Sequence, residues 1–168
     1  SGHAYHLAQA RKETGASTVV AVLSSHFVQR GEPGCLDPQT RTAMALDGGV
    51  DLVLELPVPF CCHNAGVFAS AAVDILAATG VVTHIAFGME DNLAKAKTIL
   101  SILLDEPTAF KKALMKNLDA GLSYIESRNR AVDHLLPGAG AILSRPNNSL
   151  ALAYVMRILK ARHPLEPV

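Results

Sequence analysis

Short apolar runs that alternate with helix-type segments constrain the fold of this chain most strongly. Residues 18–23, 51–56 and 81–87 are rich in aliphatic side chains. Continuous apolar runs of this length are typical of strands that are covered on both faces in a parallel sheet. Residues 37–47 and 64–78 lie between these runs and carry the end signals of helices. The alternation favours right-handed βαβ units, so the sequence predicts an α/β fold with a parallel sheet.

From residue 92 onward the pattern contains helices only. We expect a helix near the start of the chain, and four more without intervening strands over residues 95–104, 108–118, 123–136 and 148–162. Residues 92–118 hold five lysines against one Asp and one Glu; such a segment is more often a solvated helix face than an RNA-binding surface. The prediction is an α/β core over residues 1–91 and a helical region over residues 92–168, within one continuous globular unit.

Composition and charge argue against several classes of protein. Apolar residues make up 49% and charged residues 18%, and the net charge is zero, so the totals favour neither a nucleic-acid nor a membrane partner. No apolar run reaches the roughly 18 residues of a membrane span. The chain has an odd number of cysteines, Cys35, Cys61 and Cys62, which suits a reducing compartment. The run from Cys61 to His63 has no second cluster that could complete a zinc site. We expect a soluble cytoplasmic protein without metal ligands.

Polar residues follow the predicted strands, where open parallel sheets bind their ligands. The loop after the first strand contains Gln29 and Arg30, and a guanidinium fork suits phosphate or carboxylate, although an ordinary surface loop could hold the same residues. Gly2 and His3 would form an anion site at a helix N-terminus if a strand preceded them. The alternative is a helix start that carries a surface histidine.

A second group of candidates lies later in the chain. Residues 88–91 follow the third predicted strand, and Asn147 and Asn148 open the last predicted helix. One of the two asparagines is expected to cap that helix, which leaves the other free to donate hydrogen bonds outward.

Several motifs resemble one known family. Residues 1–7 resemble the second half of the signature E-Y-N-P-F-H-x-G-H-x-Y-H-L of the bacterial tRNA(Met) cytidine acetate ligase family, within the HxGH nucleotidyltransferase superfamily. Residues 22–33 resemble its V-M-S-G-x-F-x-Q-R-G-E-P loop, and residues 49–57 its G-x-D-L-V-x-E-L-P strand. The Thr-Arg pair at 40–41, Phe-Gly at 87–88 and Ser-Arg-Pro-Asn-Asn at 144–148 follow in the family's order.

The resemblance implies a fold and a reaction. The fold would be a Rossmann-like HxGH nucleotidyltransferase sheet whose first strand is missing, followed by a helical region that completes the nucleotide and tRNA site. The chain would be a fragment truncated at both ends, cut inside its own histidine motif. The parent enzyme would join acetate to ATP as acetyl-adenylate, with Mg²⁺ present, and acetylate N4 of the wobble cytidine of elongator tRNA(Met).

The resemblance also implies roles for individual residues. His3, the surviving member of the histidine pair, would be catalytic and stabilise charge on the triphosphate. The ATP-binding set would comprise Ser1, Gly2, His3, His6, Gly88, Asn147 and Asn148. Gln29 and Arg30 are expected to contact phosphate or tRNA.

Two other functions stay open from the sequence. One is an HxGH adenylyltransferase that acts on a small phosphorylated substrate, although the helices after residue 92 and the Gln-Arg-Gly-Glu-Pro loop argue against it. The other is an inactive nucleotide-binding or RNA-binding fragment, because half of the histidine pair is missing.

Overall fold

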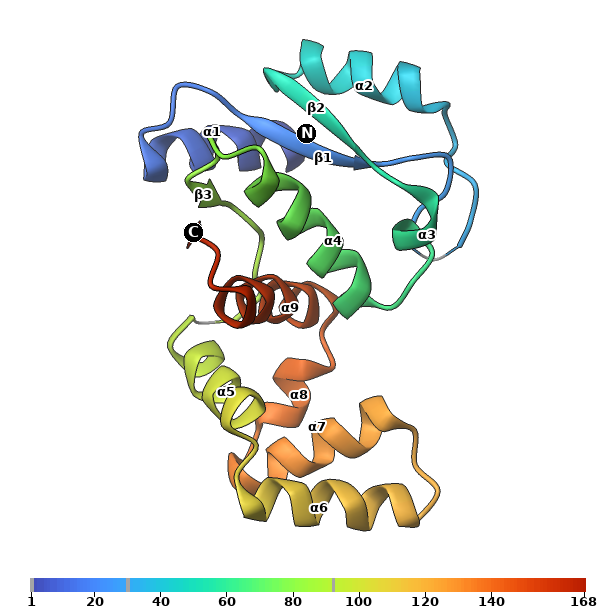
Figure 1. Cartoon of the computed structure of the whole chain (residues 1–168), viewed down its shortest axis with the longest axis vertical. Helices are drawn as coiled ribbons and strands as arrows, with labels where there is room; N and C mark the ends of the chain where they lie inside the picture. The colour runs from blue at the N-terminus through green and yellow to red at the C-terminus, as the bar shows by residue number, and fades with distance from the viewer. Residues whose placement is uncertain (1, 30, 92) are drawn as a thin grey trace. The chain divides into compact units, whose positions relative to one another are not determined.

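The computed structural model describes the chain except for Ser1, Arg30, Asn92 and the side chains of Leu93 and Ala94. Helices and strands alternate in its first half, and helices dominate its second half (Figure 1). The elements are α1 (Gly2–Thr14), β1 (Val20–Ser24), α2 (Pro38–Asp47), β2 (Leu52–Leu56), α3 (Val58–Cys61), α4 (Ala65–Ala78), β3 (His84–Ile85), α5 (Leu93–Asp105), α6 (Thr108–Asp119), α7 (Tyr124–Leu135), α8 (Ala139–Leu143), α9 (Pro146–Ala161) and β4 (Glu166–Pro167).

Two compact units are distinguished along the chain. The first unit consists of Ser1–Phe87 with Ala153–Val168, and the second of Gly88–Leu152. This division differs from the boundary expected after residue 91, because the end of the chain belongs with the α/β unit. Ile158 and Leu165 are buried there against Val73 and Ile85 in one apolar cluster.

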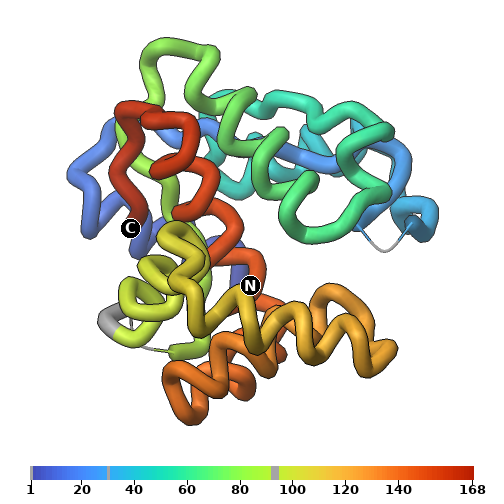
Figure 2. The backbone as a smooth tube through the Cα atoms, turned by 60° about the horizontal axis from the view of Figure 1, so that its bottom comes forward, coloured from blue at the N-terminus to red at the C-terminus, as the bar shows by residue number. Residues whose placement is uncertain are grey.

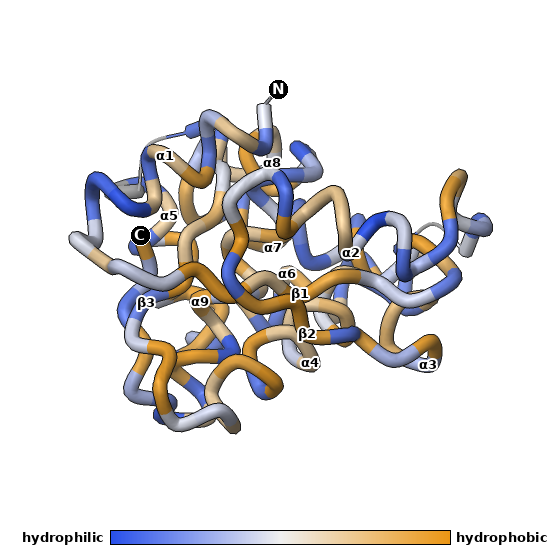
Figure 3. Tube along the Cα trace, turned by 90° about the horizontal axis from the view of Figure 1, so that it is seen from above, coloured by the Kyte–Doolittle hydropathy of each residue, from blue (hydrophilic) through white to orange (hydrophobic). Residues whose placement is uncertain are grey.

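Parallel strand pairing in the first unit confirms the predicted α/β class. β1 and β2 run parallel, in a register that sets Val20 opposite Leu52 and Ser24 opposite Leu56. The apolar run of β1 appears as a continuous orange segment in Figure 3. Helix α4 packs against both strands, and Leu56 is completely buried. Helix α2 also contacts β2, and all five residues of β1 are partly buried. Cover on more than one face agrees with the continuous apolar run of β1, because a strand covered on one face only would alternate apolar and polar residues.

The third predicted strand is much shorter than residues 81–87, and its partner was not predicted. Only His84 and Ile85 are in strand β3, which pairs in parallel with β4 at Glu166 and Pro167. In the described part of the chain the strands therefore form two two-stranded sheets, β1-β2 and β3-β4. Val81 is 75% exposed. It therefore does not lie in a covered strand, although its side chain is apolar.

Local cap signals predicted two helix starts correctly. Asp37 accepts a hydrogen bond from the Thr40 backbone nitrogen at 2.9 Å, ahead of a proline at the first helical position of α2. Asn64 accepts from the Val67 nitrogen at 3.1 Å at the start of α4. Each cap satisfies one of the amide donors that a helix start leaves without an intrahelical partner.

Helices alone build the second unit. α6 and α7 lie side by side in both views, joined by a short turn that contains Gly121 at φ 83° (Figures 1 and 2). Ser123 caps α7 by accepting from the Glu126 nitrogen at 3.3 Å. Phe110 of α6 and Val132 of α7 are among the buried side chains of this unit. No helix in the described residues has the length and apolarity needed to cross a membrane.

Candidate functional site

The first turn of α1 presents two histidines to solvent. His3 and His6 lie one helical turn apart, and both are exposed. Gly2 begins the helix, and a Cβ added there would meet no atom of the chain within 4 Å. Packing among the described residues therefore does not require glycine at this position, which leaves room for a bound molecule. Ser1, which the resemblance adds to this set, lies outside the described residues.

Hydrogen bonds from Arg11 hold the C-terminal end of α1 beside the start of β2. The Arg11 guanidinium donates to the Asp51 carboxylate at 2.8 Å and to the Gly49 carbonyl at 3.0 Å. The same carboxylate accepts from the Val19 nitrogen at 2.7 Å. The Val19 hydrogen bond and the Arg11 hydrogen bond hold the pKa of Asp51 below its usual value. These contacts fix the C-terminal end of α1 and leave its histidine-bearing first turn open to solvent.

A small hairpin leaves the carboxyl end of β1. We call residues 26–34 the β1–α2 hairpin; its two arms meet in an antiparallel bridge between Phe27 and Pro33. The Gly34 nitrogen closes its base by donating to the His26 carbonyl at 2.8 Å. In Figure 1 the connection from β1 to α2 lies at the same end of the β1-β2 sheet as α3. This is the end at which parallel sheets bind ligands.

The tip of the β1–α2 hairpin carries one of the predicted contact residues. The Gly31 nitrogen donates to the Val28 carbonyl at 2.8 Å, and the Val28 nitrogen donates to the Glu32 carbonyl at 2.9 Å. Gly31 has φ 78°, which glycine adopts without strain. Gln29 lies within this turn and is half-buried. Arg30, its predicted companion, lies outside the described residues.

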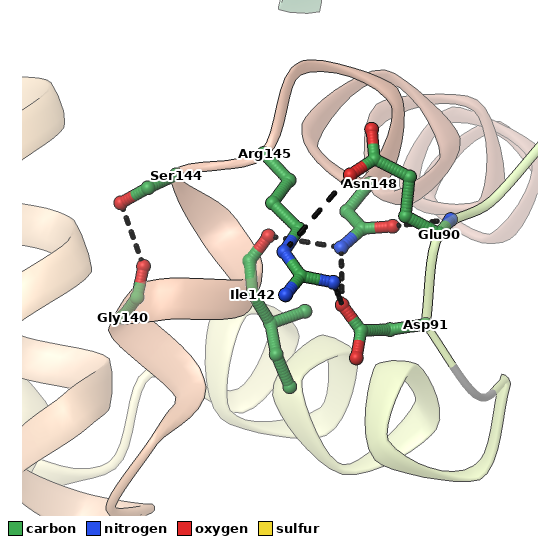
Figure 4. Close-up of polar contacts among 7 residues, drawn as sticks. All are labelled: Glu90, Asp91, Gly140, Ile142, Ser144, Arg145 and Asn148. Atoms are coloured by element: carbon green, nitrogen blue, oxygen red, sulfur yellow. Dashed lines mark hydrogen bonds and ion pairs between the residues drawn. The ribbon is translucent and has the colours of Figure 1, made fainter.

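Asn148 holds the loop after Phe87 in place in the second unit (Figure 4). Its side chain is completely buried. The amide oxygen accepts from the Glu90 nitrogen at 2.8 Å, and the amide nitrogen donates to the Asp91 carboxylate at 2.8 Å and to the Ile142 carbonyl at 3.2 Å. Both amide donors and the oxygen are therefore used inside the protein.

Two exposed groups border this buried amide. Arg145 donates to the Asp91 carboxylate at 2.9 Å and lies 3.9 Å from the Glu90 carboxylate (Figure 4). Asn147 is exposed, one residue before the buried asparagine. Gly88 leaves open space, since a Cβ there would meet no atom within 4 Å. Gly88 and Asn147 are thus exposed, whereas the Asn148 amide is used inside the unit.

The expected capping role of the asparagines is wrong. Helix α9 begins at Pro146, so Asn147 and Asn148 both lie inside its first turn. Proline suits the first helical position because that residue needs no amide donor. The helix starts before the asparagine pair, and neither asparagine occupies the position of an N-cap.

Comparison with known proteins decides the family. A model of the HIGH nucleotidyl transferase family matches residues 1–168. The chain belongs to this family. The family model covers the whole chain, including both the α1 histidines and the asparagine pair of α9.

Individual members of the HIGH nucleotidyl transferase family are similar over the same length. The chain is 42% identical to a tRNA(Met) cytidine acetate ligase of Syntrophomonas wolfei and 41% identical to one of Caldanaerobacter subterraneus. It covers 42% of each of these relatives, and 100% and 99% of the chain is matched. It therefore spans less than half the length of these curated relatives.

Solved structures agree with the sequence comparison. The crystal structure of Thermotoga maritima TmcAL bound with alpha-thio ATP matches 99% of the chain and 42% of its own chain, at TM-score 0.94 and 36% identity. The apo structure of the same protein matches at TM-score 0.93 and 34% identity. The α/β nucleotidyltransferase fold predicted from the sequence is thereby confirmed.

The surroundings of the potential metal ligands can be compared within the described part of the chain. Among the residues that the structure describes, no group of three or more His, Cys, Asp or Glu side chains could hold a metal ion. Cys61 is buried and its thiol donates to the Leu56 carbonyl at 3.0 Å, whereas Cys62 is exposed. The adjacent cysteines therefore have different surroundings.

Three residues near the candidate site had no role assigned from the sequence. Asp91 and Arg145 form the ion pair beside Asn148, and Arg41 contacts the end of β1. Arg41 and Arg145 both lie in motifs shared with the ligase family, Thr-Arg and Ser-Arg-Pro-Asn-Asn. Their place in these motifs could have marked both arginines as candidates from the sequence. Their hydrogen-bond and ion-pair partners are distant in sequence, so only the folded chain shows these partners.

Proposed function

We propose that the protein containing this chain is an ATP-dependent tRNA(Met) cytidine acetate ligase, and that this chain is its nucleotide-binding part. Similarity to curated ligases over the entire chain carries the proposal. The match to a TmcAL structure bound with alpha-thio ATP supports ATP as the nucleotide. A tRNA-modifying enzyme acts where tRNA is used, so we place the protein in the cytoplasm.

The proposed reaction has two steps. An oxygen of acetate attacks the α-phosphorus of ATP, the bond to the β-phosphate oxygen breaks, and acetyl-adenylate and pyrophosphate form. The N4 amine of the wobble cytidine in elongator tRNA(Met) then attacks the acetyl carbonyl, AMP leaves, and the amine loses a proton. Neither step needs a covalent enzyme intermediate, so catalysis consists of positioning and charge stabilisation.

The exposed first turn of α1 suits the first step. His3 would donate to triphosphate oxygens as negative charge accumulates there, and His6 would extend the contact. Gly2 would let a phosphate approach the helix N-terminus, whose amide groups attract anions. Ser1 completes this proposed set by its place in the motif.

The second unit carries the remaining described residues of the proposed ATP-binding set. Gly88 leaves its backbone accessible, and Asn147 is exposed, so we assign the outward hydrogen bond to Asn147. Asn148 belongs to the proposed ATP-binding set as the residue that holds the loop, because its own amide is fully engaged. Gln29 and Arg30 are proposed contacts to phosphate or tRNA.

Mg²⁺ would accompany the triphosphate and neutralise part of its charge. Magnesium in such sites is held by substrate phosphates with one or two carboxylates, rather than by a protein cage. The lack of a ligand cluster among the described residues is compatible with that mode. We assign no residue of this chain to the ion.

The experiment uses the complete protein with ATP, Mg²⁺, radiolabelled acetate and elongator tRNA(Met). Wild type is compared with His3→Ala and with the control His134→Ala, which removes an exposed histidine near the end of α7. Labelled N4-acetylcytidine that is lost in His3→Ala and retained in His134→Ala supports the proposal. Pyrophosphate exchange that requires a small phosphorylated substrate instead of acetate would indicate the other adenylyltransferase, and no reaction in either assay would indicate a binding module.

A further inference from the structure

We propose that Arg41 is a positioning residue that sets the β1–α2 hairpin at the carboxyl end of β1, so that the hairpin tip can bind phosphate groups. The inference rests on the proposed function, which supplies the phosphate-bearing ligands. It adds a residue to which the sequence analysis assigned no role.

Arg41 ties α2 to the end of β1. It lies in α2, and its terminal nitrogen donates to the Ser24 carbonyl at 2.8 Å and also to the Ser25 carbonyl. Ser25 is buried, and its nitrogen donates to the Leu56 carbonyl at 3.2 Å beyond the last residue pair of the two strands. Charge-assisted hydrogen bonds to these carbonyls therefore fix the point from which the chain leaves the sheet.

The same guanidinium packs against the base of the hairpin. A Cβ added to Gly34 would lie 3.4 Å from Arg41 Cζ and 3.5 Å from Arg41 Nε, and 3.1 Å from the Leu36 carbonyl oxygen. Gly34 also makes the hydrogen bond to His26 that closes the hairpin. The guanidinium therefore lies next to the residue at which the two arms of the hairpin meet.

One atom of Arg41 argues against a purely stabilising role. Its Nε is buried and has no hydrogen-bond partner among the residues that the structure describes. An unpaired buried donor is unfavourable, and an apolar side chain of similar length would avoid it. What the guanidinium adds is the pair of carbonyl contacts, which determine the direction in which the chain leaves β1.

The hairpin keeps its shape without Arg41 but needs an external contact for its orientation. The hydrogen bonds among Val28, Gly31 and Glu32 close the turn from within. These hydrogen bonds do not reach the sheet, whereas Arg41 contacts both the end of β1 and the base of the hairpin. Loss of the guanidinium is therefore expected to displace Gln29 without unfolding the turn.

Phosphate is the chemistry expected at the tip, and it has two sources here: the triphosphate of ATP and the backbone of tRNA. The test uses the complete protein and Arg41→Met, Arg41→Lys and Gly34→Ala, with Arg130→Met as control. Arg130 is an exposed arginine of α7 that pairs with Glu126 at 2.7 Å, outside the proposed site. KM and kcat are measured for acetate-dependent ATP–pyrophosphate exchange and for tRNA acetylation, and Kd is measured directly for ATP and for elongator tRNA(Met).

We expect Arg41→Met to raise KM and Kd for one ligand by roughly ten-fold, the cost of losing a charge-assisted contact. The kcat should change less, Arg41→Lys should recover part of the loss, and Arg130→Met should behave as wild type. A change confined to ATP would identify the triphosphate, and a change confined to tRNA would identify the RNA backbone. Unchanged KM and Kd in folded Arg41→Met, or a fall in kcat alone, would overturn the proposal.

Gly34→Ala gives an independent test should Arg41→Met fail to fold. A methyl group there would lie 3.1 Å from the Leu36 carbonyl oxygen, whereas it would only reach ordinary contact distance from the guanidinium. The change therefore shifts the base of the hairpin while Arg41 is kept, so the same ligand should bind more weakly; unaltered binding in the folded variant would contradict the inference. A wild-type protein that does not acetylate tRNA would refute the proposed function instead, and the two direct binding measurements would still decide the role of Arg41.

Discussion

Asn148 donates a hydrogen bond to Asp91 at 2.8 Å, across 57 residues of sequence. The same amide accepts from the backbone beside that carboxylate, at Glu90. A single buried side chain at the start of α9 therefore holds the loop that begins at Gly88. The arrangement gives the adjacent asparagines different tasks: one stabilises the loop and the other faces solvent.

Asn148→Ala should lower the free energy of unfolding by about 1–3 kcal/mol, because it leaves the Glu90 nitrogen and Asp91 without a buried partner. Asn147→Ala is the matched control: it should change stability by less than about 0.5 kcal/mol and weaken ATP binding. Urea denaturation of the complete protein, together with ATP titration, measures both effects. Equal stability losses in the two variants would contradict the division of tasks.

His3→Ala should reduce kcat for acetate-dependent ATP–pyrophosphate exchange by roughly 100-fold or more, the usual effect of removing a donor that stabilises transition-state charge. His6→Ala should reduce it less, because His6 lies one turn farther from the helix start. Both side chains are exposed, so thermal unfolding should be nearly unchanged in either variant. A larger loss in His6→Ala would reverse the assigned roles.

Gly2→Ala tests whether glycine is needed at this position for stability or for ligand binding. A methyl group at Gly2 would touch no atom of the chain, and alanine favours a helix more than glycine does, by up to about 1 kcal/mol. Stability should stay level or rise slightly, while ATP binds more weakly because the methyl group blocks a close phosphate. Wild-type Kd for ATP in this variant would show that no phosphate approaches Gly2.

Asp74 should make stability depend on pH in the acid range. Burial alone raises the pKa of Asp74, but hydrogen bonds from Arg157 and His163 outweigh it and hold the pKa below 3.8. A carboxylate with a lowered folded-state pKa contributes stability above its unfolded pKa and loses it as pH falls through the folded value. Because the pair is partly exposed, the contribution that Asp74→Asn removes should stay below about 1 kcal/mol.

Urea midpoints measured across about pH 3 to 7 test this dependence in wild type and Asp74→Asn. The two curves should differ near neutral pH, and the difference should begin to shrink as pH falls below about 4, the unfolded pKa, and continue to shrink toward the lower pKa of the folded carboxylate. Glu126→Gln, at an exposed pair on α7, is the control. A constant difference between Asp74→Asn and wild type at all pH values would contradict the ionic origin of the effect.

Signals that act within a few residues made much of this protein predictable. The apolar runs of β1 and β2, the caps at Asp37 and Asn64, and the turn glycines are local, because each depends on backbone preferences or on a hydrogen bond to a near neighbour. The family motifs likewise identified the polar loops and the first turn of α1 as candidate site regions. These features follow from the sequence by itself.

Only the tertiary structure decided the partners of residues that are distant in sequence. β3 and β4 contain two residues each, too few for any periodicity to reveal their pairing. The sequence predicted that one of Asn147 and Asn148 caps the last helix, whereas the Asn148 amide binds the loop at Glu90 and Asp91. Arg41 likewise has its partners at the end of β1. Such contacts depend on how separate segments pack, which no local preference of the chain encodes.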